Sequence, residues 1–230
     1  MPDDKLQMQR MVSAILKDDA AKAAQLLRDS PALATDHLPK PHLYNFAIFH
    51  WIYIGDTVLH LAAAGYRVAI AKLLLKAKAD PNAAANHRRS TPLHYAADGF
   101  ITGPVWREND QVQMIRCLLE RGADLHRQDK NGATPLHRAV RTRSAAAVRL
   151  LLDAGSDPAS KNRSGSTPFH LAVQNTGRGG SGAPAAVQAQ REIIREFFSR
   201  GVAPTLRDSQ GKSVADSVQS AWIREEFAWM

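Results

Sequence analysis

Four histidines recur at one position of a repeated sequence, and metal binding is the first chemistry that they could serve. Each follows a threonine by three residues, and the four are His60, His94, His137 and His170. Equivalent residues of stacked helical units lie about 8–10 Å apart. Ligands of one zinc ion lie within about 4 Å of each other, because each bond is about 2 Å long. The spacing therefore favours a structural role for these histidines over a metal site.

Other residue types that could bind a cofactor or catalyse a reaction are also poorly placed. Residues 177–182 (Gly-Arg-Gly-Gly-Ser-Gly) lack the following Lys-Ser/Thr and the preceding apolar strand of a phosphate loop, which favours an insertion. Residues 211–213 (Gly-Lys-Ser) end like such a loop, but Leu206 stands where its first glycine belongs. Cys117 lies in an apolar helical run, which is typical of a buried thiol. We therefore predict a protein that is not an enzyme and binds no cofactor or metal.

Composition and charge narrow the class of protein and of partner. The 230 residues are 44% hydrophobic and 23% charged, with 30 Lys and Arg against 22 Asp and Glu, a formal charge of +8. This excess favours acidic partners and attraction to polyanions. The sequence contains neither a signal peptide nor the roughly 20 apolar residues of a membrane helix. We expect a soluble cytoplasmic protein, and the Ala- and Arg-rich composition favours a GC-rich bacterial source.

Internal repetition defines the elements that position these residues. A Thr-x-Leu-His motif, with Phe for Leu in the last copy, precedes an alanine-rich turn four times, beginning at Thr57, Thr91, Thr134 and Thr167. Thr is a favourable helix N-cap, and the Pro that follows it in three copies suits the first helical turn. A second apolar run follows each motif and ends in Gly122, Gly155 or Gly201 in three copies, as expected at a helix C-terminus. Each repeat is therefore predicted to be a pair of helices.

These motifs resemble the ankyrin repeat, which has a period of about 33 residues and a Thr-Pro-Leu-His-x-Ala turn. The resemblance implies an all-α solenoid of stacked helix-turn-helix units with hairpin turns, and a histidine that ties its own turn to neighbouring backbone. Repeats would occupy residues 55–230, with starts near 55, 89, 132, 165 and 211, insertions at 99–110 and 176–187, and a C-terminal capping repeat. Residues 1–35 would form a degenerate helical cap, and residues 36–54 an aromatic-rich connector.

Two departures from the pattern affect the hairpin between the first two repeats. Lys78 and Arg89 stand where glycine is expected, at a cost of about 1 kcal/mol each if the backbone is left-handed. We therefore expect that hairpin to be reshaped. The connector carries five aromatic residues that we expect to pack in the core between the cap and the first repeat, with an interface as the alternative: Tyr44, Phe46, Phe49, Trp51 and Tyr53.

The resemblance also implies a binding surface, with hairpin tips as fingers and first helices as palm. Carried over by position, the partner-binding residues are His87, Arg88, Ser90, Asp98, Lys130, Asn131, Arg138, Arg141, Arg143, Arg163, Ser164 and Gln174. In the first insertion, Phe100 and Trp106 are large side chains of the kind that anchor partners. The alternative for Trp106 is that it folds back over its own loop.

The sequence thus predicts a non-catalytic, monomeric scaffold, adaptor or inhibitor that binds a protein through its concave groove and insertions. Its positive charge indicates an acidic surface or peptide as partner. The alternative is nucleic-acid or polyanion binding through the same basic face.

Overall fold

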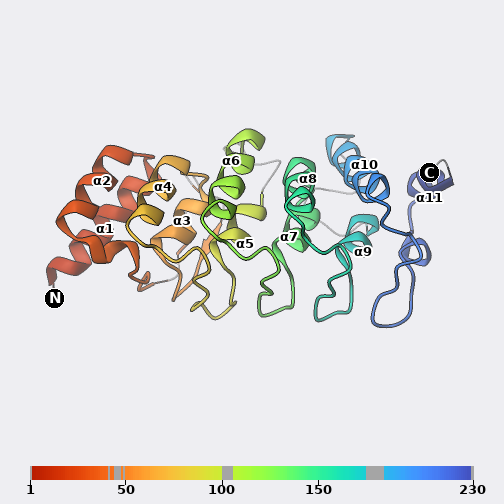
Figure 1. The fold of residues 1–230 in the computed structure, drawn as a ribbon, viewed down its shortest axis with the longest axis horizontal. Helices are drawn as coiled ribbons and strands as arrows, with labels where there is room; N and C mark the ends of the chain where they lie inside the picture. Colours follow the sequence, from red (N-terminus) through yellow and green to blue (C-terminus); the bar gives the residue numbers. More distant parts are fainter. Residues whose placement is uncertain are drawn as a thin grey trace. The chain divides into compact units, whose positions relative to one another are not determined.

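A computed structural model describes residues 2–40, 42–43, 48, 50–99, 106–174 and 184–228 of the chain. The chain forms two compact units. Unit 1 comprises Met1–Ala96 and Gly103–Asp124, and unit 2 comprises Ala97–Thr102 and Leu125–Met230. Pairs of helices follow one another along the chain within each unit (Figure 1).

Unit 1 contains the first helix pairs and a short two-stranded sheet. Its elements are α1 (Pro2–Leu16), α2 (Ala20–Asp29), η1 (Pro31–Ala34), β1 (His42–Leu43), β2 (Trp51–Ile52), α3 (Val58–Ala64), α4 (Val68–Lys76), α5 (Pro92–Ala97, of which Ala97 falls in unit 2) and α6 (Glu108–Leu119). Strands β1 and β2 are antiparallel, with His42 opposite Ile52. The second helices pack in sequence, α2 on α4 and α4 on α6, while α1 packs on both α2 and α3.

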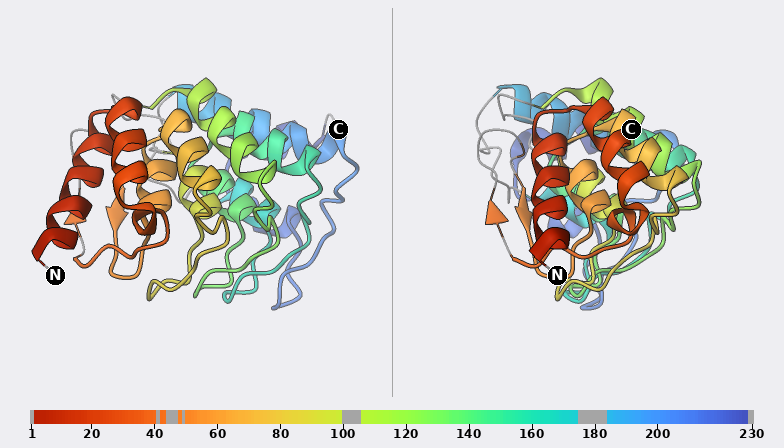
Figure 2. Two further views of the ribbon diagram at one scale, coloured as in Figure 1. Left: turned by 60° about the vertical axis from the view of Figure 1, so that its left-hand side comes forward. Right: turned by 90° about the vertical axis from the view of Figure 1, so that its left-hand side faces the viewer.

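Unit 2 repeats the helix pair twice and ends in two short helices. Its elements are α7 (Pro135–Arg141), α8 (Ala145–Asp153), α9 (Pro168–Val173), α10 (Pro184–Ser199), η2 (Ala215–Ser217) and α11 (Ala221–Ala228). First helix packs on first helix, α7 on α9, and second on second, α8 on α10. The loops that join successive pairs in this unit lie side by side, below the helices in Figure 2. The predicted all-α repeat solenoid is confirmed.

The threonine motif begins the first helices as predicted. Thr134 and Thr167 are N-caps followed by Pro, and the hydroxyl of each accepts a hydrogen bond from the backbone N–H of the histidine three residues later. The Thr57 and Thr134 motifs also form capping boxes in which the histidine ring accepts from the N-cap N–H. Each motif therefore supplies hydrogen-bond partners that the first helical turn lacks.

The backbone at Lys78 and Arg89 is left-handed, as it is at the glycines in equivalent positions. Their φ angles are 68° and 54°, against 84° at Gly122 and 71° at Gly132. The expected reshaping of this hairpin is therefore wrong at both residues. The physical reason at Lys78 is the helix-ending hydrogen bond from Ala79 N to the Leu74 carbonyl, 3.0 Å long, which holds the conformation despite the side chain.

The two repeats with predicted insertions end their first helix differently from the others. In the uninterrupted repeat of unit 2, the backbone N–H of Ser144 donates to the carbonyl of Ala139 over 3.0 Å. In the following repeat, the equivalent carbonyl of Ala172 accepts from Gln190 Nε2 over 2.7 Å. Gln190 is 4% exposed and lies in α10, after the insertion. A buried glutamine thus replaces the backbone donor that the insertion displaces.

Unit 1 contains the same substitution of donor. Gln111 of α6 is fully buried, and its Nε2 donates to the Ala96 carbonyl over 3.0 Å. The corresponding carbonyl in the uninterrupted repeat, that of Ala62, accepts from Arg67 N over 2.9 Å. Residues 100–105 and 175–183, which include half of the first insertion and most of the second, lie outside the described residues.

The connector does not place all its aromatic side chains in the core. Ile48 and Ile52 are each 1% exposed, whereas Trp51 is 43% exposed. The expected core packing is therefore wrong for Trp51. Alternation along β2 explains this, because neighbouring strand residues point to opposite faces. Tyr44, Phe46 and Phe49 lie outside the described residues.

Candidate functional site

The hairpin tips of unit 2 are held by an Asp side chain that bonds to its own turn. Asp129 Oδ1 accepts from the N–H groups of Asn131 (2.7 Å) and Ala133 (3.0 Å). Asp208 Oδ1 accepts from the N–H groups of Gln210 (2.8 Å) and Lys212 (2.9 Å). Such turns fix the backbone without help from a partner. The side chains at the tips therefore project from a preformed frame.

Neighbouring hairpins of unit 2 are also bonded to each other. The N–H of Arg163 donates to the Asn131 carbonyl over 2.8 Å, and the N–H of Ser209 donates to the Gly165 carbonyl over 3.1 Å. A Cβ on Gly165 would lie 2.4 Å from Ser209 Cβ, so only glycine permits this approach. The three hairpins form a continuous layer at a fixed spacing.

The repeated histidines join each repeat to the next hairpin. His137 Nδ1 accepts from the backbone N–H of Thr134 over 3.2 Å, so its proton resides on Nε2, which donates to the Ser166 carbonyl over 3.2 Å. His170 Nε2 likewise donates to the Lys212 carbonyl over 3.0 Å. The predicted structural role is confirmed.

Burial keeps the histidines of this set neutral where a shift is resolved. Desolvation lowers the pKa of His137 to about 4, although the bond to Ser166 and the charges of Asp129 and Asp157 oppose the shift. Desolvation also lowers the pKa of His60 in unit 1, against the charge of Asp56. Within the described part of the chain, no group of three or more His, Cys, Asp or Glu side chains could hold a metal ion.

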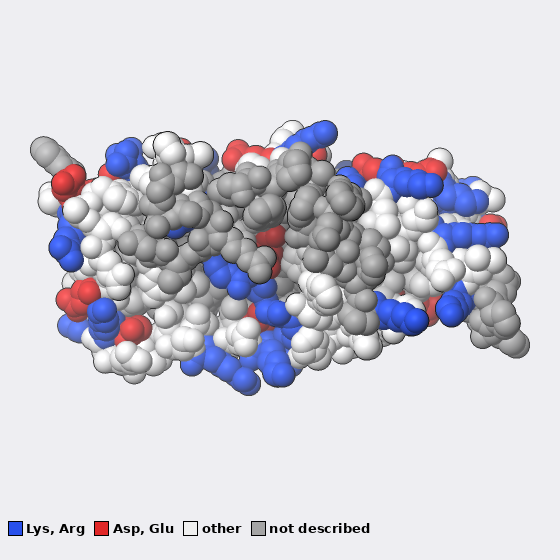
Figure 3. Space-filling model, turned by 180° about the vertical axis from the view of Figure 1, so that it is seen from behind, with Lys and Arg blue, Asp and Glu red and all other residues white. Residues whose placement is uncertain are grey.

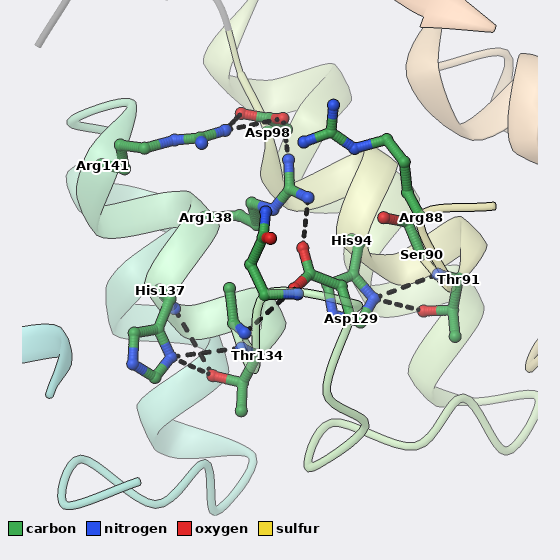
Figure 4. Close-up of polar contacts among 12 residues, drawn as sticks. Arg88, Ser90, Thr91, His94, Asp98, Asp129, Thr134, His137, Arg138 and Arg141 are labelled. Atoms are coloured by element: carbon green, nitrogen blue, oxygen red, sulfur yellow. Dashed lines mark hydrogen bonds and ion pairs between the residues drawn. The ribbon is translucent and has the colours of Figure 1, made fainter. Parts of the chain in front are cut away.

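A buried ion network occupies the first-helix face of unit 2 (Figure 4). Arg138 donates to Asp98 Oδ2 over 2.8 Å through Nη1 and forms a short ion pair with Asp129 through Nη2. The side chains of Arg138 and Asp129 are 6% and 1% exposed. Arg141, at 49%, reaches Asp98 from the solvent side over 3.0 Å. Of the positive charge predicted for the binding face, that of Arg138 and Arg141 is thus compensated by two aspartates.

The electrostatics of the network follow from its burial and pairing. Burial by itself would raise the pKa of the Asp129 carboxyl, but the charge and hydrogen bond of Arg138 hold that pKa below its usual value. The two aspartates likewise raise the pKa of Arg138 against desolvation. Both ions therefore stay charged inside the fold.

The structure separates the predicted partner-binding residues into exposed and internal ones. His87, Lys130, Asn131, Arg163 and Ser164 are exposed on hairpin tips. Ser90, Arg138 and Arg143 are at most 5% exposed. Gln174 is half-buried, and its carbonyl accepts from Gln190 over 3.4 Å. Figure 3 shows the coloured Lys and Arg side chains in separate groups, several beside Asp or Glu, rather than as one basic surface.

The first insertion holds its tryptophan against its own repeat. Trp106 is half-buried, and its indole Nε1 donates to Gln111 Oε1 over 3.0 Å. Because Gln111 in turn caps α5, the ring is fixed to unit 1 by the residue that closes the insertion. Phe100 lies outside the described residues.

Unit 1 has an aromatic tip around Tyr53, a residue for which an interface was the alternative to core packing. Arg88 Nη1 donates to the Tyr53 hydroxyl over 3.0 Å, with its guanidinium 5.3 Å from the ring centre, and the His87 ring contacts Tyr53 edge-on. Trp51 and Ile54 beside it are 43% and 61% exposed. The period-2 pattern of the strand was the signal that could have identified Trp51 as exposed.

Family comparisons agree with this architecture. A profile described as "Ankyrin repeat" matches residues 54–86 and 88–130, and one described as "Ankyrin repeats (many copies)" matches residues 118–172. These matches together cover more than half of the chain. The chain belongs to the ankyrin repeat family. Ankyrin repeats generally serve as protein-interaction modules, and the proteins that contain them are generally non-enzymatic scaffolds.

Similar curated proteins share only a segment with this ankyrin repeat chain. Ankyrin repeat domain-containing protein 53 of Homo sapiens is 36% identical over 89 residues, which are 38% of this chain and 15% of that protein. Alpha-latrotoxin-Lt1a of Latrodectus tredecimguttatus is 33% identical over 88 residues, 38% of this chain and 6% of that protein. The chain thus spans a small part of the relatives it matches. None of its described helices is long and apolar enough to cross a membrane.

Proposed function

We propose that this chain is a non-catalytic adaptor or inhibitor that binds an acidic protein surface or peptide through its hairpin tips. The observation that carries the proposal is the pair Lys130 and Arg163, exposed at equivalent positions of adjoining hairpins. Hydrogen bonds within and between the hairpins already hold their backbone, so binding orders little. A cytoplasmic location, a bacterial source and a monomeric state belong to the same proposal.

Exposed cations can bind a partner, whereas the buried ones already interact within the protein. Arg138 is buried between two aspartates, so its charge is compensated before any partner arrives. Arg141 is exposed but already bonded to Asp98. Desolvation lowers the pKa of the buried Arg143, which the fold encloses. Lys130 and Arg163 are therefore the residues to change.

A paired charge reversal tests this assignment. Bead-bound wild-type protein, a Lys130→Glu/Arg163→Glu variant and a Lys72→Glu/Lys76→Glu variant would each capture proteins from lysate of the source organism. Lys72 and Lys76 are exposed on α4, so the control makes the same change in net charge elsewhere. We expect the first variant to lose a protein that the wild type and the control retain, as identified by mass spectrometry.

Two results would contradict the proposal. Equal capture by both variants would remove the hairpin tips from the binding surface. Binding of duplex DNA or RNA in a gel shift, lost in the Lys130→Glu/Arg163→Glu variant and weakening steeply with salt, would favour the nucleic-acid alternative.

A further inference from the structure

We infer that the hairpin layer of unit 2 binds an extended, proline-rich segment of its partner that carries a carboxylate at every third residue. This inference rests on the proposed function and specifies the chemistry of the partner. It uses cations beyond those predicted from the family pattern. Each of the three hairpins presents two exposed cations, which are Arg127 and Lys130, Lys161 and Arg163, and Arg207 and Lys212.

Most acidic side chains of these hairpins already form hydrogen bonds or ion pairs within the protein. Asp129 is buried against Arg138, and Asp208 accepts two backbone N–H groups of its own turn. The exposed Asp157 accepts from Ala159 N and the Ser160 hydroxyl, and Asp216 accepts from Ser213 N. The six cations thus face solvent beside carboxylates that already have hydrogen-bond donors. A negatively charged segment would meet a net positive layer.

Four of the six cations recur at equivalent positions of neighbouring hairpins. Lys130 and Arg163 each stand four residues before the threonine of their repeat, Thr134 or Thr167. Lys161 and Arg207 form a second row, each six residues before the residue that starts the next repeat, Thr167 or Ser213. Hydrogen bonds between the hairpins fix the intervals within these rows. Each row therefore holds two cations one repeat apart, whereas Arg127 and Lys212 belong to neither row.

The interval between the two cations of a row indicates the backbone conformation of the bound segment. In unit 2, α7 packs on α9 and α8 on α10, and packed helices lie about 8–10 Å apart. We take the same interval for hairpins that are one repeat apart. A polyproline II helix has three residues per turn and a rise of about 3.1 Å, so every third side chain returns to one face after about 9 Å. In a β-strand, side chains on one face recur after only about 6.6–6.8 Å. The interval within each row therefore matches the polyproline II spacing.

The chemistry of the hairpins favours a peptide over a single-stranded nucleic acid. Proteins that bind single strands place aromatic rings beside their cations so that bases can stack. Residues 121–134, 155–167 and 201–213, which contain all six cations, include no Phe, Tyr or Trp. Arg207 also donates to the Gly211 carbonyl over 2.5 Å, which holds its guanidinium at the tip. A preordered guanidinium of this kind suits a carboxylate.

Two isomeric peptides separate spacing from charge. The probes are fluorescein-labelled (Glu-Pro-Pro)₄ and an isomer with four consecutive Glu followed by eight Pro, and the readout is fluorescence anisotropy of the full chain at two salt concentrations. We expect the spaced peptide to bind at least about tenfold more tightly than the block isomer. A Lys161→Glu/Arg207→Glu variant should lose about tenfold for the spaced peptide, while Lys72→Glu/Lys76→Glu should retain its affinity within about twofold.

The outcomes distinguish this inference from the proposed function. Equal affinity for both isomers would overturn the spacing argument, as would tighter binding of a labelled oligothymidylate. If the lysate partner is nevertheless lost in Lys130→Glu/Arg163→Glu, the proposed function survives without the inference. If the spaced peptide is not bound and that variant keeps every captured protein, both fall.

Discussion

Replacing Arg138 with leucine removes the central cation of the buried network in unit 2. The change suits the site sterically, because Leu171 stands at the same position of the next repeat. It leaves the carboxylates of Asp129 and Asp98, whose side chains are 1% and 13% exposed, without their shared partner. Arg141 still compensates Asp98 from the solvent side, but Asp129 has no other cation in the network drawn in Figure 4.

The magnitude follows from burial. Removing one partner of a buried ion pair costs about 3–5 kcal/mol, because a charge remains without compensation in a region of low polarity. We expect this loss for Arg138→Leu. An Arg138→Leu/Asp129→Asn double variant should recover most of it, since asparagine keeps the turn hydrogen bonds and carries no charge. The next repeat already combines these two residue types, as Asn162 and Leu171.

Urea unfolding followed by far-UV circular dichroism measures both effects. Arg141→Leu is the matched control, because its half-exposed pair with Asp98 should be worth only about 0–1 kcal/mol. A loss below about 1 kcal/mol for Arg138→Leu would show that the buried pair does not hold the fold. A double variant less stable than Arg138→Leu would show that the destabilisation does not come from the stranded carboxylate.

Three further predictions concern single features of the fold. Lys78→Gly should stabilise the protein by about 0.5–1 kcal/mol in urea unfolding, since relief of the left-handed backbone exceeds the entropy that glycine adds to the unfolded chain. The control Lys72→Gly, inside α4, should destabilise the protein. A lower free energy of unfolding in both variants would contradict the reasoning. Folding lowers the pKa of His137 from 6.5 to about 4, so between these pH values the unfolded chain binds a proton that the folded chain does not. The free energy of unfolding should therefore decrease by about 3 kcal/mol as the pH falls from 6.5 toward 4. His137→Gln should flatten this part of the pH–stability curve, and an unchanged slope would locate the titration elsewhere. Gln190→Leu should lower the free energy of unfolding by about 1–3 kcal/mol, because the buried Ala172 carbonyl of α9 loses its donor. The exposed Gln188→Leu should change it by less than about 0.5 kcal/mol. Equal effects of the two changes would show that the hydrogen bond of Gln190 does not stabilise the end of α9.

The burial of Arg138 bears on how this ankyrin repeat chain presents charge to a partner. A formal charge of +8 indicates a basic protein, but part of that charge is enclosed. The exposed cations that remain lie where hydrogen bonds between hairpins fix their spacing. The net charge therefore predicts that the partner is negatively charged, while the fold determines the spacing of the cations that would contact it.

Local chemistry made the architecture predictable from the sequence. The threonine N-cap, the proline of the first turn and the histidine three residues later act within one helical turn, so their meaning does not depend on distant residues. Their recurrence identified the helix pairs and the family. The structural role of the histidines was predictable for another reason, since equivalent residues of successive repeats lie too far apart to bind one metal ion.

Tertiary structure decided which of the predicted binding residues face solvent. Arg138 and Arg163 are the same residue type in equivalent repeats, yet one is buried by Asp98, 40 positions away in sequence, and the other is exposed at a tip. Trp106 was equally ambiguous until Gln111 was seen to accept its indole N–H. Residue type alone does not tell whether an arginine or a tryptophan is buried, because burial requires polar partners that other parts of the chain supply.

The sequence by itself therefore determined the repeat, its helix starts and its overall charge, because short-range hydrogen bonds and helix geometry encode them. Only the tertiary structure decided that Lys78 and Arg89 would accept a left-handed backbone, that Arg138 would be neutralised, and that six cations would form a spaced layer. The ion network and the cation layer depend on groups brought together from different repeats, and the energy of such contacts is fixed by burial and distance rather than by residue type. At Lys78 the deciding contact is the helix-ending hydrogen bond from Ala79 N to the Leu74 carbonyl.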